Sequence, residues 1–93
     1  MAETLDNIFG AYVNQGTLED AATWMANLTR HHPELAEEFI TALQKGMAAA
    51  SKGDRSVIKA VNAGGEQVST AEEAGARCLE LLTLYSKLLR QHR

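Results

Sequence analysis

A chain of 93 residues with a formal net charge of −3 is expected to fold as one domain, residues 1–93. Its acidity argues against a nucleic-acid binder, because that role normally needs a basic face. Hydrophobic residues make up 45% of the sequence, but 15 of them are Ala and the larger ones are mostly Leu, which favours helices over sheet. The single Cys excludes an internal disulfide, and residues 1–6 lack the apolar segment of a secretory signal. No run of apolar residues approaches the ~20 that a membrane span needs. A cytoplasmic location is therefore expected.

The first predicted helix is short and amphipathic. Its apolar residues recur at spacings typical of one helix face and are Leu5, Ile8, Phe9, Tyr12 and Val13. Thr4 is a candidate N-cap. The helix is expected to end near Gln15-Gly16, with Gly16 in the left-handed conformation that closes many helices.

A second helix is expected to open at Thr17, with two acidic residues in its first turn that complement the helix dipole. It should end at Arg30-His31, because the residue before Pro33 is disfavoured in the α conformation. Its inner face is formed by Leu18, Ala21, Ala22, Met25, Leu28 and Thr29. Trp24 falls on the flank of that face.

Pro33 is predicted to be the first residue of a third helix, a position that its fixed backbone suits. The core side of this helix is formed by Ala36, Phe39, Ile40, Leu43, Met47 and Ala50. Gly46 lowers the helix propensity by about 1 kcal/mol relative to Ala, and a close helix crossing at this point would offset that cost.

A short fourth helix is predicted from residue 55 to about residue 63, after Gly53 closes the third. Gly64-Gly65 should end it. Residues 66–69 are expected to form a loop or a short extended segment in which Val68 is the apolar anchor.

The last predicted helix, Thr70 to His92, opens with the capping-box pattern Thr70 to Glu73 and is apolar around more than half of its circumference. One packing partner covers only a stripe, so this surface needs several helices or a second chain. At 1.5 Å per residue the helix is about 34 Å long, whereas a chain of this size has a radius of gyration of about 12 Å. It must therefore form the spine of the fold or project from it. The sequence predicts an all-α protein, a compact bundle of four or five helices with the long C-terminal helix as spine.

No catalytic or cofactor motif is found, and no cofactor is expected. The function predicted is therefore a small non-enzymatic cytosolic protein-interaction module of an adaptor, regulatory or immunity type, which binds a protein partner or itself through apolar helix faces. The residues expected to contact the partner are Trp24, Leu79, Leu84 and Leu88. Leu84 lies beside a polar arc of the last helix, so its exposure would mark an interface.

Two alternatives remain open. His31 and His32 precede Glu34, Glu37 and Glu38, a cluster that would suit a small ligand or a metal ion, although the acids also complement the dipole of the third helix. A basic group, formed by Lys45, Lys52, Arg55 and Lys59, would suit an anion or an acidic peptide. With the basic C-terminal residues Arg90, His92 and Arg93, this group would also suit a nucleic-acid accessory protein. Cys78 is expected to be a buried, inert thiol.

Overall fold

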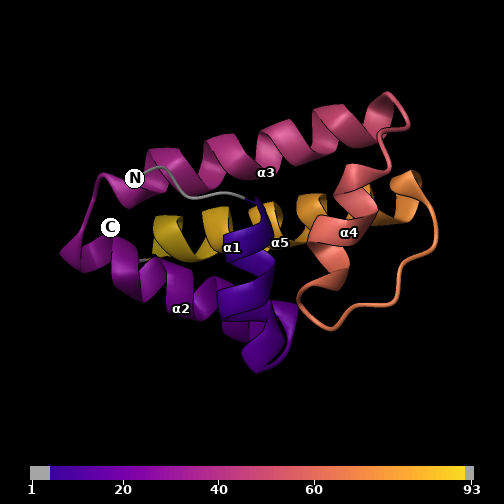
Figure 1. Cartoon of the computed structure of the whole chain (residues 1–93). Helices are drawn as coiled ribbons and strands as arrows, with labels where there is room; N and C mark the ends of the chain where they lie inside the picture. Colours follow the sequence, from indigo (N-terminus) through magenta and orange to yellow (C-terminus); the bar gives the residue numbers. More distant parts are fainter. Residues whose placement is uncertain (1–4, 92–93) are drawn as a thin grey trace.

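The computed structural model describes residues 5–91, and all its regular elements are helical, with no strand in that range (Figure 1). The elements are α1 (Leu5–Asn7), the π-helix η1 (Ile8–Tyr12), the 3₁₀ helix η2 (Val13–Gln15), α2 (Leu18–His31), α3 (Leu35–Ser51), α4 (Ser56–Asn62) and α5 (Ala71–Gln91). The predicted all-α class is confirmed. The proposed N-cap Thr4 and the basic residues His92 and Arg93 lie outside the described residues.

Helix α5 is the spine of the bundle, as the sequence predicted. It packs most extensively against α3 and α2, while α1 and α4 lie across it from the side that faces the viewer in Figure 1. The described chain has a radius of gyration of 12.2 Å, so the long helix lies along the bundle rather than projecting from it. No helix among residues 5–91 is long and apolar enough to cross a membrane.

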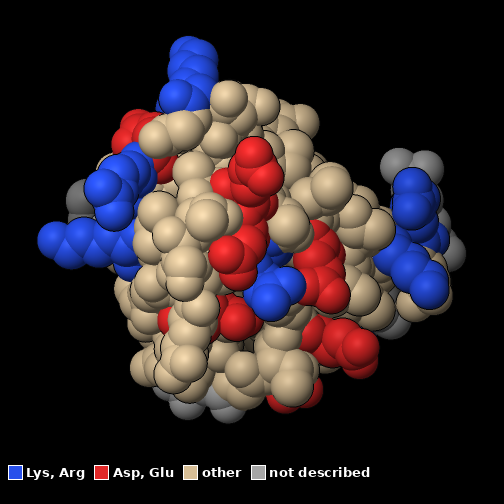
Figure 2. Space-filling view, turned by 90° about the vertical axis from the view of Figure 1, so that its right-hand side faces the viewer, with Lys and Arg blue, Asp and Glu red and all other residues tan. Residues whose placement is uncertain are grey.

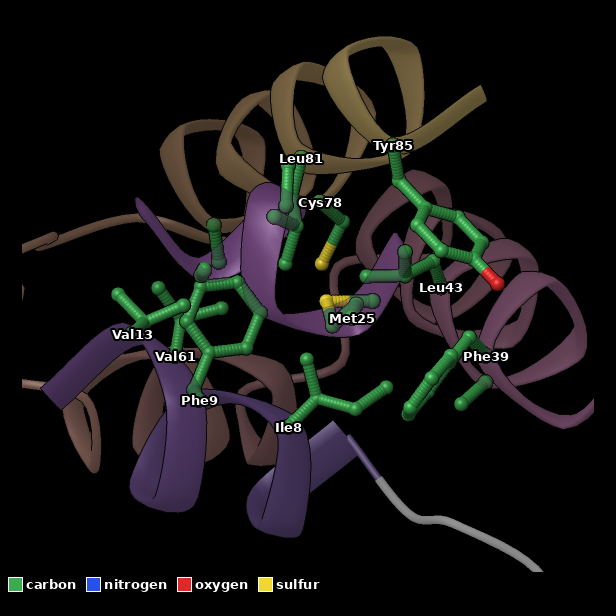
Figure 3. Packing of buried hydrophobic residues seen from close by; sticks show 14 of the residues in the cluster. Ile8, Phe9, Val13, Met25, Phe39, Leu43, Val61, Cys78, Leu81 and Tyr85 are labelled. Atoms are coloured by element: carbon green, nitrogen blue, oxygen red, sulfur yellow. The ribbon is translucent and has the colours of Figure 1, made fainter. Parts of the chain in front are cut away.

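The core lies between α5 and the other helices, and every helix contributes to it (Figure 3). Phe39 is central: its ring meets those of Tyr12 and Tyr85 edge to face, with centroids 5.8 Å and 5.6 Å apart. Edge-to-face pairs of this kind add about 1 kcal/mol to the effect of burial alone. The largest fully buried side chains are Tyr85, Phe9, Phe39, Ile8, Met25, Leu43 and Leu81. Tyr85 thus fixes α5 against α3 at the centre of the bundle.

The N-terminal segment departs from the regular helix that the sequence predicted. After three α-helical residues the chain widens into a π turn and then tightens into a 3₁₀ turn. In an α-helix Ile8 and Val13 would lie about 140° apart around the axis. The wider π turn brings them closer, and both are buried. The prediction for Gly16 was wrong: its φ of 176° is extended, because the chain runs straight on to the cap of α2.

The boundaries of α2 agree with the prediction, but the start of α3 does not. Thr17 and Asp20 form a reciprocal capping box, with hydrogen bonds of 3.1 Å and 3.2 Å, and α2 ends at His31. Pro33 is not the first residue of α3; it lies in a turn, and the helix begins at Leu35. The amide of Leu35 donates to the carbonyl of His32, three residues back, so a tighter turn precedes the first α-helical bond.

The close crossing predicted at Gly46 is present. A Cβ atom at this position would lie 3.0 Å from the Sγ atom of Cys78 and 2.9 Å from a methyl group of Leu5. Gly75 makes a second close contact, since a Cβ there would lie 2.7 Å from the Cβ of Ala50. Glycines on both helices therefore let the backbones of α3 and α5 approach each other.

The segment between α4 and α5 is tied to α4 by one side chain. The amide of Asn62 donates to the carbonyl oxygen of Val68 (3.1 Å), and the amide of Val68 donates to the side-chain oxygen of Asn62 (2.9 Å). Val68 is buried, which confirms it as the anchor of the segment. Gly65, with φ of 87°, supplies the left-handed residue that follows α4.

Candidate functional site

Two grooves run beside α5, one on each flank. The first, here called the α3/α5 groove, is lined by Met47, Ala50, Ser51, Glu72, Gly75, Ala76 and Leu79. A shallow continuation lies over Gly53 and Thr70, where α3 ends and α5 begins. Leu79 stands at this groove with 54% of its surface exposed. Gly75 and Ala50 let α3 and α5 pack closely along this groove.

The second groove, here called the α2/α5 groove, is lined by Glu19, Ala22, Thr23, Leu84, Lys87, Leu88 and Gln91. Leu84 and Leu88 are half-buried and pack against the core. The remaining groups around them are mostly polar or charged. In the sequence-based prediction, exposure of Leu84 would mark an interface. Leu84 is instead half-buried and packs at the edge of the core.

The four predicted contact residues do not form one surface. Leu84 and Leu88 share the α2/α5 groove, Leu79 lies in the α3/α5 groove, and Trp24 lines neither of them. Trp24 lies on α2 and is 58% exposed. Among the described residues, Trp24 and Leu79 are the two large hydrophobic side chains that are exposed. Two separate apolar positions are thus available to a partner.

The four basic residues predicted to dock an anion are all exposed: Lys45, Lys52, Arg55 and Lys59. Asp54 lies among them, and its carboxylate accepts a hydrogen bond from the amide of Ser56 (2.9 Å). The hydrogen bonds from Ser56 lower the pKa of Asp54, so a negative charge is held within the basic group. Figure 2 shows this end of the molecule, where acidic side chains gather near the centre and most basic ones lie at the edges.

Two acidic side chains at this end of the molecule form ion pairs with Arg77. The guanidinium of Arg77 lies 3.6 Å from the carboxylate of Glu66 and 3.8 Å from that of Glu80. These groups are partly exposed, so each pair contributes little to stability. The pair with Glu66 links the segment before α5 to the second turn of the helix, and the pair with Glu80 lies within α5.

The histidine cluster is open and loosely arranged. His31 and His32 are exposed, and the Nδ1 atom of His32 lies 3.6 Å from a carboxylate oxygen of Glu34. Between residues 5 and 91 no group of three or more His, Cys, Asp or Glu side chains is close enough to hold a metal ion. The structure therefore offers no cage for the metal ion of the alternative hypothesis.

Two reactive groups of α5 point inward rather than to either groove. Burial raises the pKa of the Cys78 thiol to about 11, so the thiol is protonated and unreactive at neutral pH. Burial also raises the pKa of Tyr85. The prediction that Cys78 is a buried, inert thiol agrees with its complete burial.

The Thr29–Tyr85 contact was not anticipated from the sequence. Their hydroxyl oxygens lie 2.6 Å apart and both are buried. The hydroxyl of Thr29 donates its one proton to the carbonyl of Met25 (2.8 Å), so Tyr85 must be the donor to Thr29. The sequence placed Thr29 on the inner face of α2, and Tyr85 belongs to the apolar face of α5. Their hydrogen bond could not be predicted, because it depends on how the two helices pack.

Comparison with known proteins identified no matching family model, no similar curated protein and no similar solved structure. The function is therefore argued from the residues of this chain.

Proposed function

We propose that this protein is a non-enzymatic protein-interaction module that binds another polypeptide through the α3/α5 groove. The observation that carries the proposal is Leu79, a large apolar residue that is 54% exposed beside a groove of small residues. Burying the exposed part of a Leu side chain contributes about 1 kcal/mol to binding. The groove beside Leu79 gives a partner a concave surface against which this side chain can be buried.

The shape of the groove suits a helix as the bound element. Ala50, Gly75 and Ala76 line it with small side chains, over which a second helix can approach closely. Met47 is half-buried at the same groove, and its flexible side chain can adapt to a partner. The α2/α5 groove is a poorer choice, because Glu19, Lys87 and Gln91 line it beside half-buried leucines.

The placement of the reactive side chains supports a non-enzymatic role. Catalysis by Cys78 would require an accessible thiolate, whereas this thiol is buried and its pKa is raised. Catalysis by His31 or His32 would require a pocket and an orienting group. Both are exposed at the turn between α2 and α3, and neither lines either groove beside α5.

The test is site-specific crosslinking in the native cells. A photo-crosslinking amino acid is placed at position 79, and in a matched control at position 48, an exposed Ala on α3 that does not line the groove. We expect a discrete covalent adduct from position 79 and none from position 48. The adduct is identified by mass spectrometry. Leu79→Glu should abolish association in a pull-down while leaving the circular dichroism spectrum unchanged.

Equal crosslinking from both positions, or none from either, would contradict the proposal. If Leu79→Glu instead unfolded the protein, Leu79 would belong to the core and the interface would be misplaced.

A further inference from the structure

A line of six residues follows one side of α5, and its first half lines the α3/α5 groove. The residues are spaced alternately by four and three and are Glu72, Ala76, Leu79, Thr83, Ser86 and Arg90. This spacing keeps them on one face of a helix and is the spacing along which two helices pack side by side. All of them are exposed except Ser86, which is half-buried. We call this set the outer line of α5.

The outer line has opposite charges at its ends and small or apolar side chains between them. Glu72 and Arg90 lie eighteen residues apart on α5, about 27 Å at 1.5 Å per residue. Neither is part of an ion pair within the described chain. The midpoint of the line falls at residue 81. From either end a charged residue is followed by a small one, and Leu79 and Thr83 lie on the two sides of the midpoint.

We propose that a second copy of this chain docks on the outer line, with the two α5 helices antiparallel about a two-fold axis at residue 81. Glu72 of each copy then lies beside Arg90 of the other, Ala76 lies beside Ser86, and Leu79 lies beside Thr83. Both ion pairs form at once because an isologous interface repeats each contact. This inference rests on the proposed function and names its partner.

The side chains at the centre suit this contact. The hydroxyl of Thr83 donates to the carbonyl oxygen of Leu79 in its own helix (2.8 Å). Burying Thr83 against Leu79 of the second copy therefore leaves no hydroxyl donor unsatisfied, and its methyl group provides apolar contact. Ala76 and Ser86 are small enough for the helix backbones to approach closely.

The arrangement also fills the α3/α5 groove. The C-terminal half of the second copy's α5 lies along Ala76 and Leu79, which line that groove together with Met47 and Ser51 of α3. A standard interface covers about 800 Å² of each partner. That is about one-seventh of the 5756 Å² surface of this chain. With one large exposed apolar residue per copy, we expect a dissociation constant in the micromolar range.

Charge reversal at the two ends of the line tests the pairing. The wild type should change from about 10 to about 20 kDa with rising concentration in sedimentation or light scattering, since the chain mass is 10.1 kDa. Glu72→Arg and Arg90→Glu should each raise the dissociation constant about tenfold or more, because each places like charges together twice per dimer. The double variant should restore the wild-type constant.

Matched controls separate pairing from net charge. Glu73→Arg and Lys87→Glu make the same changes in charge one and three residues away, on exposed positions off the outer line. Both should leave the dissociation constant unchanged. If the controls weaken the dimer as much as the single reversals do, or if the double variant is no better than either single one, the antiparallel pairing is overturned.

The mass of the wild type distinguishes this inference from the proposed function. A wild type that stays at 10 kDa at high concentration, while position 79 crosslinks to a different protein, overturns self-association and leaves the interaction module standing. A 10 kDa wild type with no adduct at position 79 overturns both.

Discussion

The inner and outer sides of α5 both carry leucines, but their surroundings differ. Leu81 and Cys78 on the inner side are fully buried against α2 and α3, whereas Leu79, between them in sequence, is 54% exposed. The comparison teaches that apolar character around a helix does not set its burial; the position of the neighbouring helices does.

Thiol accessibility should give the largest difference. The Leu79→Cys variant carries one thiol on each side, at adjacent positions. With a thiol reagent at pH 8 and submicromolar protein, we expect one fast phase from the outer thiol. A second phase from Cys78 should be slower by about a thousandfold or more, because the buried, protonated thiol reacts only after unfolding. Two phases of similar rate would show that the inner side of α5 is open to solvent.

Truncation of leucines should show the same contrast in stability. Leu81→Ala should lower the free energy of unfolding by about 3 kcal/mol, because it leaves a cavity in the core. Leu79→Ala should lower it by less than about 0.5 kcal/mol, because the side chain is half in solvent already. Urea denaturation measures both. Equal losses would contradict the division of α5 into two sides.

The buried hydroxyl pair should respond asymmetrically. Thr29→Val removes the acceptor of Tyr85 and leaves its buried hydroxyl unsatisfied, at a cost of about 2 kcal/mol. Tyr85→Phe removes the donor and should cost about 1 kcal/mol, since Thr29 still donates to Met25. The double variant should lose less than the sum of the two, as a double-mutant cycle would record. Strict additivity would mean that the two hydroxyls do not interact.

Alkaline pH should lower the stability of the folded protein through the thiol of Cys78. The pKa of Cys78 rises from an ordinary value of 9.0 to about 11 in the folded protein, so folding favours the protonated thiol. Its contribution to stability is present below pH 9 and is lost as the pH rises toward 11. The wild type should therefore lose stability relative to Cys78→Ala over this interval. Tyr85 titrates in both proteins, so the difference isolates the thiol; parallel curves would contradict its burial.

Much of the candidate site was predictable, because local chemistry and periodicity specify which residues share a helix face. The exposed Leu79 was among the predicted partner contacts. The spacing of the six residues of the outer line can be recognised in the sequence once α5 is known to be one continuous helix. The assignment of Leu84, Leu88 and Trp24 to the same surface did not follow, because the flanks of α5 are covered by different helices. Only packing separates a half-buried core edge from an exposed position.

The sequence by itself determined the helical class, the caps at Thr17 and Asp20, the end of α2 before Pro33 and the anchoring role of Val68, since each depends on a few adjacent residues. Tertiary structure alone decided the π turn at Ile8–Tyr12 and the Thr29–Tyr85 hydrogen bond. These features satisfy packing between segments far apart in the chain, where a small gain in burial outweighs a local backbone preference. For the same reason, the exposure of Leu79 depends on how α2 and α3 pack beside α5, and not on the sequence of α5 alone.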